Sequence, residues 1–538
     1  MRLWGRGLAT TLSVAVSVSI TVAPGHAAPT AGAPVMACEA IPKPDVPGAT
    51  VVSITGVRNT SYSVPATARS PGISGLAICD VVVTLSHPGA NDLVTVEVFL
   101  PLAGWNGRFQ GVGGGGYDTD NGQASLAPAA SSGYAAGITD GGHPITDVEP
   151  VWALNADGTT NWPLVVDFAS RSLHDMTVVG KAVTTSFYGT PPHHSYWNGC
   201  STGGRQGMIE AQRYPGDYNG VLAAAPAINW PTLLVAGGWP QVVYHDAGLF
   251  PSLCELDAFT NASIAECDGL DGLVDGIIGN PATCPFEPAQ LVGSQLDCSS
   301  YGGGEEVTVT SQVAGVVSRI WAGPTTPSGA RLWYGLNKGA PLSTLANTTT
   351  LPNGTSVGVP DFFSSTWAAY FLKRDPTFDY STVDYSQFLD FYIQSNDEYE
   401  WAIGTRNPDL APFRDLGGKM ITWHGLADPL IMTNNTIDYR ERVNALFGSS
   451  NAAVDEFWRL FLAPGVNHCG GGLGAVPTDP LAALVTWVEQ GVAPETLPAS
   501  SPRANGTTAE HHLCLYPLTS KYTGGDPAVA TSYSCVPL

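Results

Sequence analysis

The chain has 538 residues, far more than one small hydrophobic core needs, which indicates one core with a large insertion or a second domain. Its 46 Asp and Glu residues against 23 Lys and Arg residues give a formal net charge of -23 at pH 7. A charge of this sign repels nucleic-acid phosphates and anionic membrane surfaces, so we expect no nucleic-acid partner.

The N-terminus has the layout of a secretory signal peptide, which we place at residues 1–28. Two arginines precede an apolar stretch at 8–22, and small residues follow it. This stretch is shorter than the ~20 residues that span a bilayer, and no later stretch is long and apolar enough. We therefore predict a secreted mature protein with no membrane partner.

Strands and helices alternate in the first part of the chain and again near its end. Val-rich or short apolar runs predict strands, and apolar residues at helical spacing predict helices. Such alternation is typical of an α/β fold with a mostly parallel sheet. The predicted strands are 93–100, 107–112, 132–138, 194–198, 220–225, 419–423 and 457–462, and the predicted helices are 161–187, 202–213 and 480–490.

The segment 230–415 breaks this alternation and is rich in Gly, Pro, Asn and Thr. We interpret it as an inserted lid domain. The remaining ranges, 38–229 and 416–538, then form one catalytic domain.

A tight turn between a strand and a helix is predicted at Gly199-Cys200-Ser201-Thr202-Gly203. The pattern fits the G-x-S-x-G nucleophile elbow, in which small flanking residues leave the serine exposed. In an α/β-hydrolase the acid and the histidine follow in that order, each after a late strand. Asp428 and His468 stand at these positions, so we predict a Ser201, Asp428, His468 triad on an α/β-hydrolase core.

All 10 cysteines follow the leader, and none share C-x-x-C spacing, which favours disulfides over zinc. Cys200 precedes the predicted nucleophile and Cys469 follows the predicted base. A Cys200–Cys469 bond would hold these Cα atoms about 5.5–6 Å apart. We therefore expect this disulfide to preorganise the site.

An ester hydrolase also needs N–H donors for the developing oxyanion. Thr202, directly after the nucleophile, supplies one donor. The glycines at 113–116 follow an early strand and fit the second, because glycine lets backbone approach a substrate closely. We assign this donor to Gly115, although the pattern does not distinguish among the four glycines.

Residues 267–277 interleave Asp268, Asp271 and Asp275 with glycines and contain no basic residue. Carboxylates this close repel one another unless a hard cation lies between them, and calcium suits such oxygen ligands. The spacing differs from that of an EF-hand. A Cys267–Cys284 disulfide around the loop would make the site rigid and structural.

Together the Gly-Cys-Ser-Thr-Gly-Gly stretch at 199–204, the Asp428 loop and Asn467-His468-Cys469 resemble the tannase and feruloyl esterase family, which includes mono(2-hydroxyethyl) terephthalate hydrolases. The resemblance runs from about Cys38 to Cys535. It implies Ser201 as nucleophile, Asp428 as acid, His468 as base, and calcium ligation by the three aspartates with the Leu273 and Ile277 carbonyls. By the same analogy the disulfides are Cys38–Cys79, Cys200–Cys469, Cys267–Cys284 and Cys514–Cys535, which leaves Cys254 with Cys298.

Family members act on esters of aromatic acids, so the resemblance implies a small-molecule galloyl, feruloyl or related ester as substrate. The insert offers aromatic side chains for such a ring, most of which we expect in its core: Phe362, Phe363, Trp367, Tyr370, Phe371, Tyr392 and Trp401. Arg374 or Arg406 could meet the carboxylate of a terephthalate monoester, the alternative substrate, but we expect each to form a surface ion pair instead. The alternative of another class is a catalytically silent, calcium-dependent binding protein on the same fold.

Overall fold

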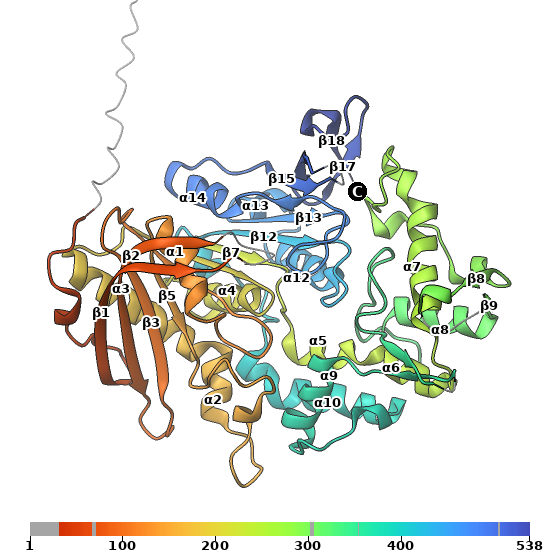
Figure 1. The fold of residues 1–538 in the computed structure, drawn as a ribbon, viewed down its shortest axis with the longest axis horizontal. Helices are drawn as coiled ribbons and strands as arrows, with labels where there is room; N and C mark the ends of the chain where they lie inside the picture. Colours follow the sequence, from red (N-terminus) through yellow and green to blue (C-terminus); the bar gives the residue numbers. More distant parts are fainter. Residues whose placement is uncertain (1–31, 67–71, 302–305, 353, 504–505, 538) are drawn as a thin grey trace, which may run out of the picture.

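A nine-stranded sheet forms the centre of the molecule (Figure 1). The computed structural model describes residues 32–66, 72–301, 306–352, 354–503 and 506–537, so the predicted leader 1–28 lies outside the described residues. The strand order is β1-β2-β3-β5-β4-β6-β7-β12-β13. The strands are β1 (Thr50–Val64), β2 (Ile73–Ser86), β3 (Val94–Pro101), β4 (Arg108–Val112), β5 (Ala135–Thr139), β6 (His194–Cys200), β7 (Gly220–Ala224), β12 (Lys419–Gly425) and β13 (Trp458–Ala463).

The strands from β5 to β13 in this order run parallel, whereas β1, β2 and β3 pair antiparallel at one edge. Parallel strands covered on both faces read as short apolar runs, which is why most of them were predictable. The strand predicted at 132–138 begins later, at Ala135, because helix α1 (Leu126–Ser131) ends in a turn at Gly133, whose φ is +84°. The pattern did not indicate β1, whose side chains are largely exposed and polar.

Helices cover both faces of the sheet. Helices α3 (Ser172–Tyr188), α4 (Thr202–Arg213) and α12 (Thr433–Leu446) pack on one apolar face, and α1 and α14 (Pro480–Gln490) pack on the other. The helix predicted at 161–187 is divided into α2 (Trp162–Val166), a π-helical turn at Asp167–Arg171, and α3. The layers match an α/β-hydrolase fold.

Residues 230–415, which we call the insert, leave the sheet after β7 and return before β12, at the lower right of Figure 1. None of the described strands of the insert joins the nine-stranded sheet. Despite its Gly and Pro content, the insert is largely helical and packs around a hydrophobic cluster of its own, shared with Phe168 and Trp152. Its helices are α5 (Trp230–Gly237), α6 (Trp239–Ala247), α7 (Leu253–Cys267), α8 (Ser311–Ala322), α9 (Phe362–Thr366), α10 (Tyr385–Ile403) and α11 (Ala411–Asp415).

Short strands complete the fold. Pairs β8 (Gln295–Asp297) with β9 (Glu306–Thr308) and β10 (Thr348–Thr350) with β11 (Ser356–Gly358) lie in the insert. After α13 (Asn451–Asp455), the C-terminal part adds β14 (Val476–Pro477), β15 (Thr496–Pro502), β16 (Thr508–Cys514), β17 (Leu518–Tyr522) and β18 (Tyr533–Pro537).

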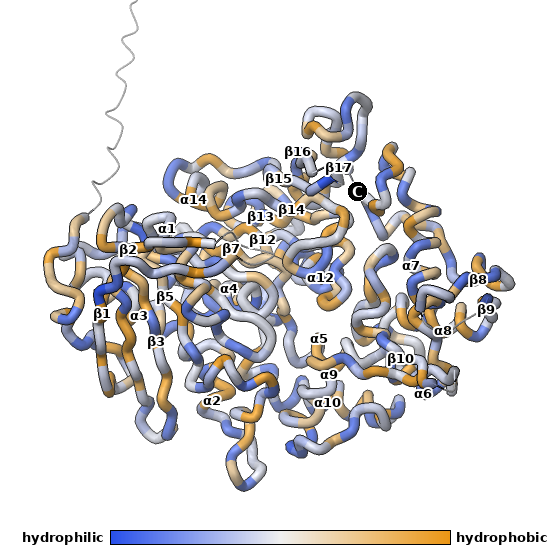
Figure 2. Tube along the Cα trace, in the orientation of Figure 1, coloured by the Kyte–Doolittle hydropathy of each residue, from blue (hydrophilic) through white to orange (hydrophobic). Residues whose placement is uncertain are grey.

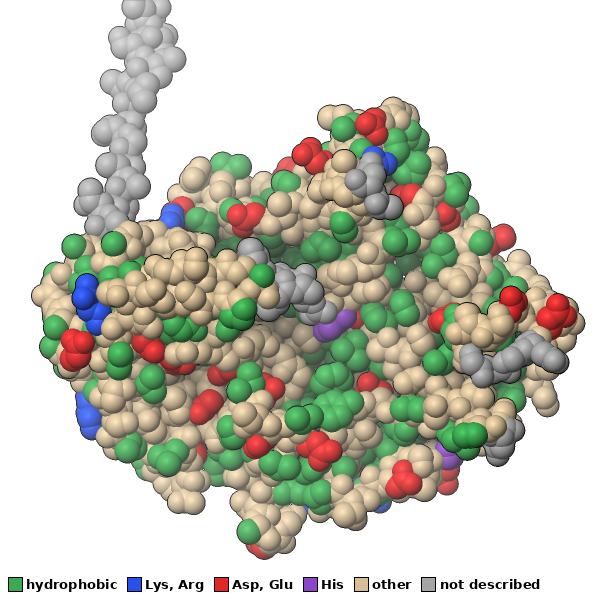
Figure 3. Space-filling model, viewed as in Figure 1, with side chains coloured by type: hydrophobic (Ala, Val, Ile, Leu, Met, Phe, Trp, Pro, Cys, Tyr) green, Lys and Arg blue, Asp and Glu red, His purple; other side chains and the backbone are tan. Residues whose placement is uncertain are grey.

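Within the described ranges, no helix is long and apolar enough to cross a membrane, and Figure 2 shows hydrophobic stretches broken by polar ones. Acidic side chains are spread over the face in Figure 3, with few Lys and Arg among them.

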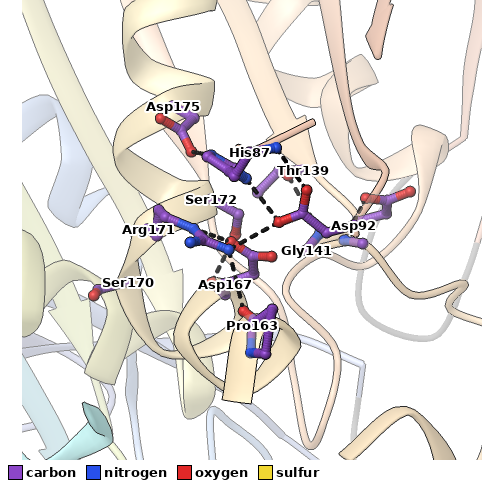
Figure 4. A network of polar contacts seen from close by, with 12 residues as sticks. His87, Asp92, Thr139, Gly141, Pro163, Asp167, Ser170, Arg171, Ser172 and Asp175 are labelled. Carbon is purple, nitrogen blue, oxygen red and sulfur yellow. Dashed lines mark hydrogen bonds and ion pairs between the residues drawn. The ribbon is translucent and has the colours of Figure 1, made fainter. Parts of the chain in front are cut away.

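A buried polar network joins the β2–β3 turn to the start of α3 (Figure 4). The His87 ring lies between two carboxylates, with Nδ1 2.8 Å from Asp92 and Nε2 3.0 Å from Asp175. Arg171 donates to Asp92 at 2.9 Å and to Asp167 at 2.6 Å. The hydrogen bond to Asp175 raises the pKa of His87, although burial opposes this rise.

The π-helical turn beside this network supports α4. The Arg205 guanidinium of α4 is fully buried and donates to the carbonyls of Ala169 and Phe168. It also lies over the rings of Phe168 and Trp230, at 5.1 and 5.5 Å from their centroids. Burial lowers the pKa of Arg205 to about 9. The polar network around His87 therefore stabilises the π-helical turn, and the carbonyls of that turn bind the buried Arg205 guanidinium, four residues after Ser201.

We predict that Asp92→Ala destabilises the protein by about 3 kcal/mol, because it leaves His87 and Arg171 without their shared carboxylate in the interior. Denaturant unfolding of the two proteins measures this difference. Asp45→Ala, at an exposed carboxylate, is the control and should change stability by less than about 0.5 kcal/mol. A loss below about 1 kcal/mol in Asp92→Ala would contradict the role of the network.

Candidate active site

Ser201 occupies a strained turn between β6 and α4. Its φ of 63° and ψ of -122° lie in a region that non-glycine residues rarely adopt. Surrounding backbone holds the turn: Ser201 N–H donates to the Ala224 carbonyl at 3.0 Å, and the Ser201 carbonyl accepts from Ala227 and Arg205. Strain that is held in place this way is typical of a nucleophile elbow.

The two glycines of the motif are needed because backbone approaches them closely. A Cβ at Gly199 would lie 2.5 Å from the Gly203 carbonyl carbon. A Cβ at Gly203 would lie 3.1 Å from the Gly114 carbonyl oxygen, in the loop after β4. The small residues therefore bring the elbow, its helix and the glycine loop into direct contact.

Asp428 and His468 meet where β12 and β13 end. His468 Nδ1 lies 2.7 Å from Asp428 Oδ2, and the other carboxylate oxygen accepts from the Leu430 and Ile431 N–H groups at 2.9 Å. Asp428 is buried, whereas the His468 side chain keeps 19% of its surface exposed. A buried carboxylate at Nδ1 favours the tautomer that has its proton there and leaves Nε2 able to accept a proton.

A second histidine, His424, also contacts Asp428 and was not singled out in the sequence. Its Nε2 lies 3.1 Å from Asp428 Oδ2, and its Nδ1 lies 2.9 Å from Thr436 Oγ1. Burial alone would raise the pKa of Asp428, but His468 and His424 together hold it well below its usual range. The signal was present in His424-Gly425-Leu426-Ala427-Asp428, where the histidine is the last residue but one of β12.

The Cys200–Cys469 disulfide joins the elbow to the histidine loop, with Cα atoms 6.0 Å apart across 269 residues of sequence. Ser201 and His468 are the immediate neighbours of the two cysteines. Ser201 Oγ makes no hydrogen bond to the residues described, and such bonds commonly tighten only when substrate binds. The other four pairs also match the predicted ones: Cys38–Cys79, Cys254–Cys298, Cys267–Cys284 and Cys514–Cys535.

The glycine loop has two N–H groups that make no hydrogen bond to the residues described. The N–H groups of Gly113 and Gly114 are taken by the Asn198 carbonyl and the Gln206 side chain. Those of Gly115 and Gly116 have no acceptor among the residues described. Gly116 lines the same pocket as Ser201 and Thr202, whereas Gly115 does not. Oxyanion donation by Gly115 thus stays a prediction, and Gly116 is a second candidate.

The pocket at Ser201 lies between the catalytic loops and the insert. Its walls are mainly apolar and come from α5, α9 and the segment after Asp428; the lining residues are Gly116, Ser201, Thr202, Ala227, Trp230, Leu233, Leu234, Gly237, Leu345, Asp361, Phe363, Ser364, Leu430 and Ile431. Most of these were missed in the sequence because they come from separate elements. The lining suits a largely apolar group.

Of the aromatic residues considered for ring recognition, only Phe363 lines this pocket. Trp367, Tyr370 and Phe371 are buried in the core of the insert, Tyr392 packs against that core, and Trp401 is exposed. Phe362, with 39% of its surface exposed, lies beside Tyr117. Arg374 pairs with Glu398, and Arg406 donates to Thr232 and Asn396, so neither arginine lines the pocket.

The aspartates of the 267–277 loop lie together beside the C-terminal strands. Asp268 accepts from the N–H groups of Asp275 and Gly276 at 2.9 Å. Burial raises the pKa of Asp275 to about 6, and Asp271 and Asp268 add to this by repulsion. No basic side chain pairs with the three carboxylates in the described chain. The oxygen donors and the uncompensated charge suit a hard cation, although the three carboxylates do not all lie within 4.8 Å of one another.

Comparison with known proteins extends this picture. A family model described as "Tannase and feruloyl esterase" matches residues 79–536. A probable feruloyl esterase of Arthroderma benhamiae is 46% identical over 93% of both chains. A mono(2-hydroxyethyl) terephthalate hydrolase of Piscinibacter sakaiensis is 32% identical over 90% of this chain and 88% of its own.

Solved structures agree with the sequence matches. A tannin acyl hydrolase from Aspergillus niger has a TM-score of 0.85 and 29% identity, covering 93% of this chain and 94% of its own. Feruloyl esterase B from Aspergillus oryzae has a TM-score of 0.78 and 28% identity, covering 93% and 99%. With its elbow, its late acid and histidine and its inserted helices, the chain belongs to the tannase and feruloyl esterase family of carboxylic ester hydrolases.

Proposed function

We propose that the chain hydrolyses esters of aromatic acids through an acyl-enzyme on Ser201. The observation that carries this proposal is the Asp428–His468 hydrogen bond, held by a disulfide beside a strained serine. The apolar pocket at Ser201 and the names of the relatives, which include feruloyl esterases and a tannase, support an aromatic acyl group. A silent binding protein would need neither the strained turn nor the buried carboxylate.

In this mechanism Ser201 Oγ attacks the ester carbonyl carbon while His468 Nε2 takes the hydroxyl proton. Asp428 stabilises the imidazolium that forms. The ester C–O bond then breaks, and His468 returns the proton to the leaving alcohol. Water attacks the acyl-enzyme with His468 again as base, which releases the aromatic acid and restores the serine.

Backbone N–H groups stabilise the negative charge on the carbonyl oxygen. Thr202 is the first residue of α4, where helix N–H groups have no partner within the helix. Gly115 or Gly116 supplies the second donor. The insert serves as a lid over the acyl group, because its residues Trp230, Leu233 and Phe363 form much of the pocket wall.

We further propose a structural calcium ion in the 267–277 loop, held by Asp268, Asp271 and Asp275 with the carbonyls of Leu273 and Ile277. Calcium would supply the positive charge that these side chains lack. The Cys267–Cys284 disulfide closes this segment, and Tyr522 of β17 lies against Gly272. The loop is part of the insert and not of the pocket, so the ion would stabilise the fold.

We also propose that residues 1–28 are a signal peptide and that the mature protein is secreted. Five disulfides are consistent with an extracellular location, because reducing compartments keep thiols unpaired.

Replacing the nucleophile tests the reaction itself. We expect Ser201→Ala to lower kcat by about 10⁴-fold or more on methyl ferulate, methyl gallate or a terephthalate monoester, whichever the native protein hydrolyses. Ser131→Ala, at an exposed serine of α1, should keep native rates. Equal turnover by Ser201→Ala and the native protein would exclude this serine as nucleophile.

The depressed pKa of Asp428 predicts how the stability of the protein changes with pH. Because its folded pKa is depressed, Asp428 contributes stability that is present above pH ~4 and is lost only as the pH falls through the folded value. Asp428 thus stays ionised as the pH falls from neutrality toward ~4, so protonation of this carboxylate does not limit activity in that range. Asp428→Asn should lower kcat by about 10³–10⁴-fold with the fold retained. An Asp428→Asn enzyme with near-native kcat would refute the assignment.

Calcium removal should act on stability. We expect EGTA to lower the Tm of the native protein by several degrees and added calcium to restore it, since a bound ion stabilises only the folded state. Asp271→Asn should lower the Tm and abolish its response to calcium. Asp297→Asn, at an exposed aspartate of the insert outside the loop, is the matched control. A Tm that is indifferent to EGTA and calcium would contradict the site.

A further inference from the structure

The pocket at Ser201 contains a single charged side chain among its lining residues, Asp361. Its other polar groups on side chains are the Ser201, Thr202 and Ser364 hydroxyls and the Trp230 indole N–H, which is buried and makes no hydrogen bond within the described residues. No Lys, Arg or His belongs to this lining. A lone carboxylate in an otherwise apolar wall is costly, because burial takes its charge out of water.

Asp361 sits at the N-cap of α9. Its Oδ2 accepts from Ser364 N–H at 2.9 Å and from Ser364 Oγ at 3.0 Å. Its Oδ1 accepts no side-chain hydrogen bond, and no cation pairs with it, among the residues that the structure describes. Burial raises the pKa of Asp361, while hydrogen bonds from Ser364 and from the Phe363 backbone oppose that rise. A carboxylate has about four acceptor positions, so Asp361 can accept a further hydrogen bond from a ligand.

Asp361 and Ser201 belong to different walls of one pocket. Ser201 comes from the elbow, whereas Asp361, Phe363 and Ser364 come from the start of α9 in the insert. Trp230 and Leu233 of α5 line the same pocket. An acyl group on Ser201 that fills this pocket would bring its far substituent to the polar end of α9.

We propose that Asp361 is a specificity-determining residue that accepts a hydrogen bond from a phenolic hydroxyl of the acyl ring and repels a ring that carries a carboxylate. This inference rests on the proposed function and decides between its two substrate classes. A phenol O–H bonded to a carboxylate is a charge-assisted hydrogen bond. A terephthalate monoester instead brings a second negative charge toward Asp361, and like charges at contact are unfavourable.

The two arginines that would receive a substrate carboxylate are engaged elsewhere. Arg374 pairs with Glu398 and donates to Thr160 Oγ1 at 2.8 Å. Arg406 donates to Thr232 Oγ1 and to Asn396 Oδ1, each at 2.6 Å. Neither reaches the pocket lining, so nothing in that lining compensates a carboxylate on the ring.

A substrate series on the native enzyme tests the inference without any mutation. The esters are methyl 4-hydroxycinnamate, methyl 4-methoxycinnamate and the methyl monoester of 4-carboxycinnamate, which differ only at the para position. We expect kcat/KM to be about tenfold or more higher for the hydroxyl than for the methoxy ester, and lowest for the carboxylate. Equal values for hydroxyl and methoxy esters, or a preference for the carboxylate, would overturn the proposal.

Asp361→Asn assigns this preference to the side chain. Asparagine keeps the N-cap of α9, so the helix retains its first hydrogen bond. We expect the hydroxyl-to-methoxy ratio of kcat/KM to fall by about tenfold and the carboxylate-to-methoxy ratio to rise. The matched control is Asp384→Asn, which removes a carboxylate from the N-cap of α10, outside the pocket, and should leave both ratios at native values. Unchanged ratios in Asp361→Asn would refute the assignment.

Ser201→Ala separates the two levels of inference. Turnover that Ser201→Ala abolishes but that shows no para preference leaves the proposed function standing and removes the role of Asp361. Turnover of none of these esters, nor of methyl gallate, by the native enzyme would overturn both proposals.

Discussion

The geometry of the site depends on one covalent constraint, the bond between Cys200 and Cys469. It joins the elbow after β6 to the loop after β13, which are 269 residues apart in sequence. The sheet already places both loops at the carboxyl ends of its parallel strands. Because Ser201 and His468 directly adjoin these two cysteines, the disulfide limits the distance between them. Asp428, which is buried, orients the imidazole of His468 through a hydrogen bond.

The elbow is strained, so the surrounding structure must hold it. Backbone bonds to Ala224 and Ala227 hold Ser201 directly, and close packing of Gly199 against Gly203 leaves no room for side chains. Arg205 of α4 also stabilises the elbow, because its buried guanidinium donates hydrogen bonds to the carbonyls of a π-helical turn. That turn is fixed in its own right by the network around His87. Helix α4 thus links the stability of the fold to the geometry of the site, because it follows Ser201 and carries Arg205.

The insert gives the site its chemical selectivity. The core contributes the serine, the acid and the base, whereas α5 and α9 contribute most of the wall that an acyl ring touches. Members of one fold can therefore accept different acids by changing a few residues of the insert. In this chain the wall contains Asp361 and no cationic side chain, which is the basis of the selectivity proposed above.

The sequence alone determined the family, the α/β class, most parallel strands and the positions of Ser201, Asp428 and His468, because each depends on local patterns in a set order. The exposed, polar strand β1 and the helices of the insert were not predicted, since their stability comes from packing and pairing with distant segments. Only the tertiary structure showed His424 against Asp428, Gly116 beside Ser201, and Asp361 in the pocket wall. Gly116 and Asp361 lie in segments far from Ser201 in sequence and no local pattern links them to it, so only the folded chain brings them to the same pocket.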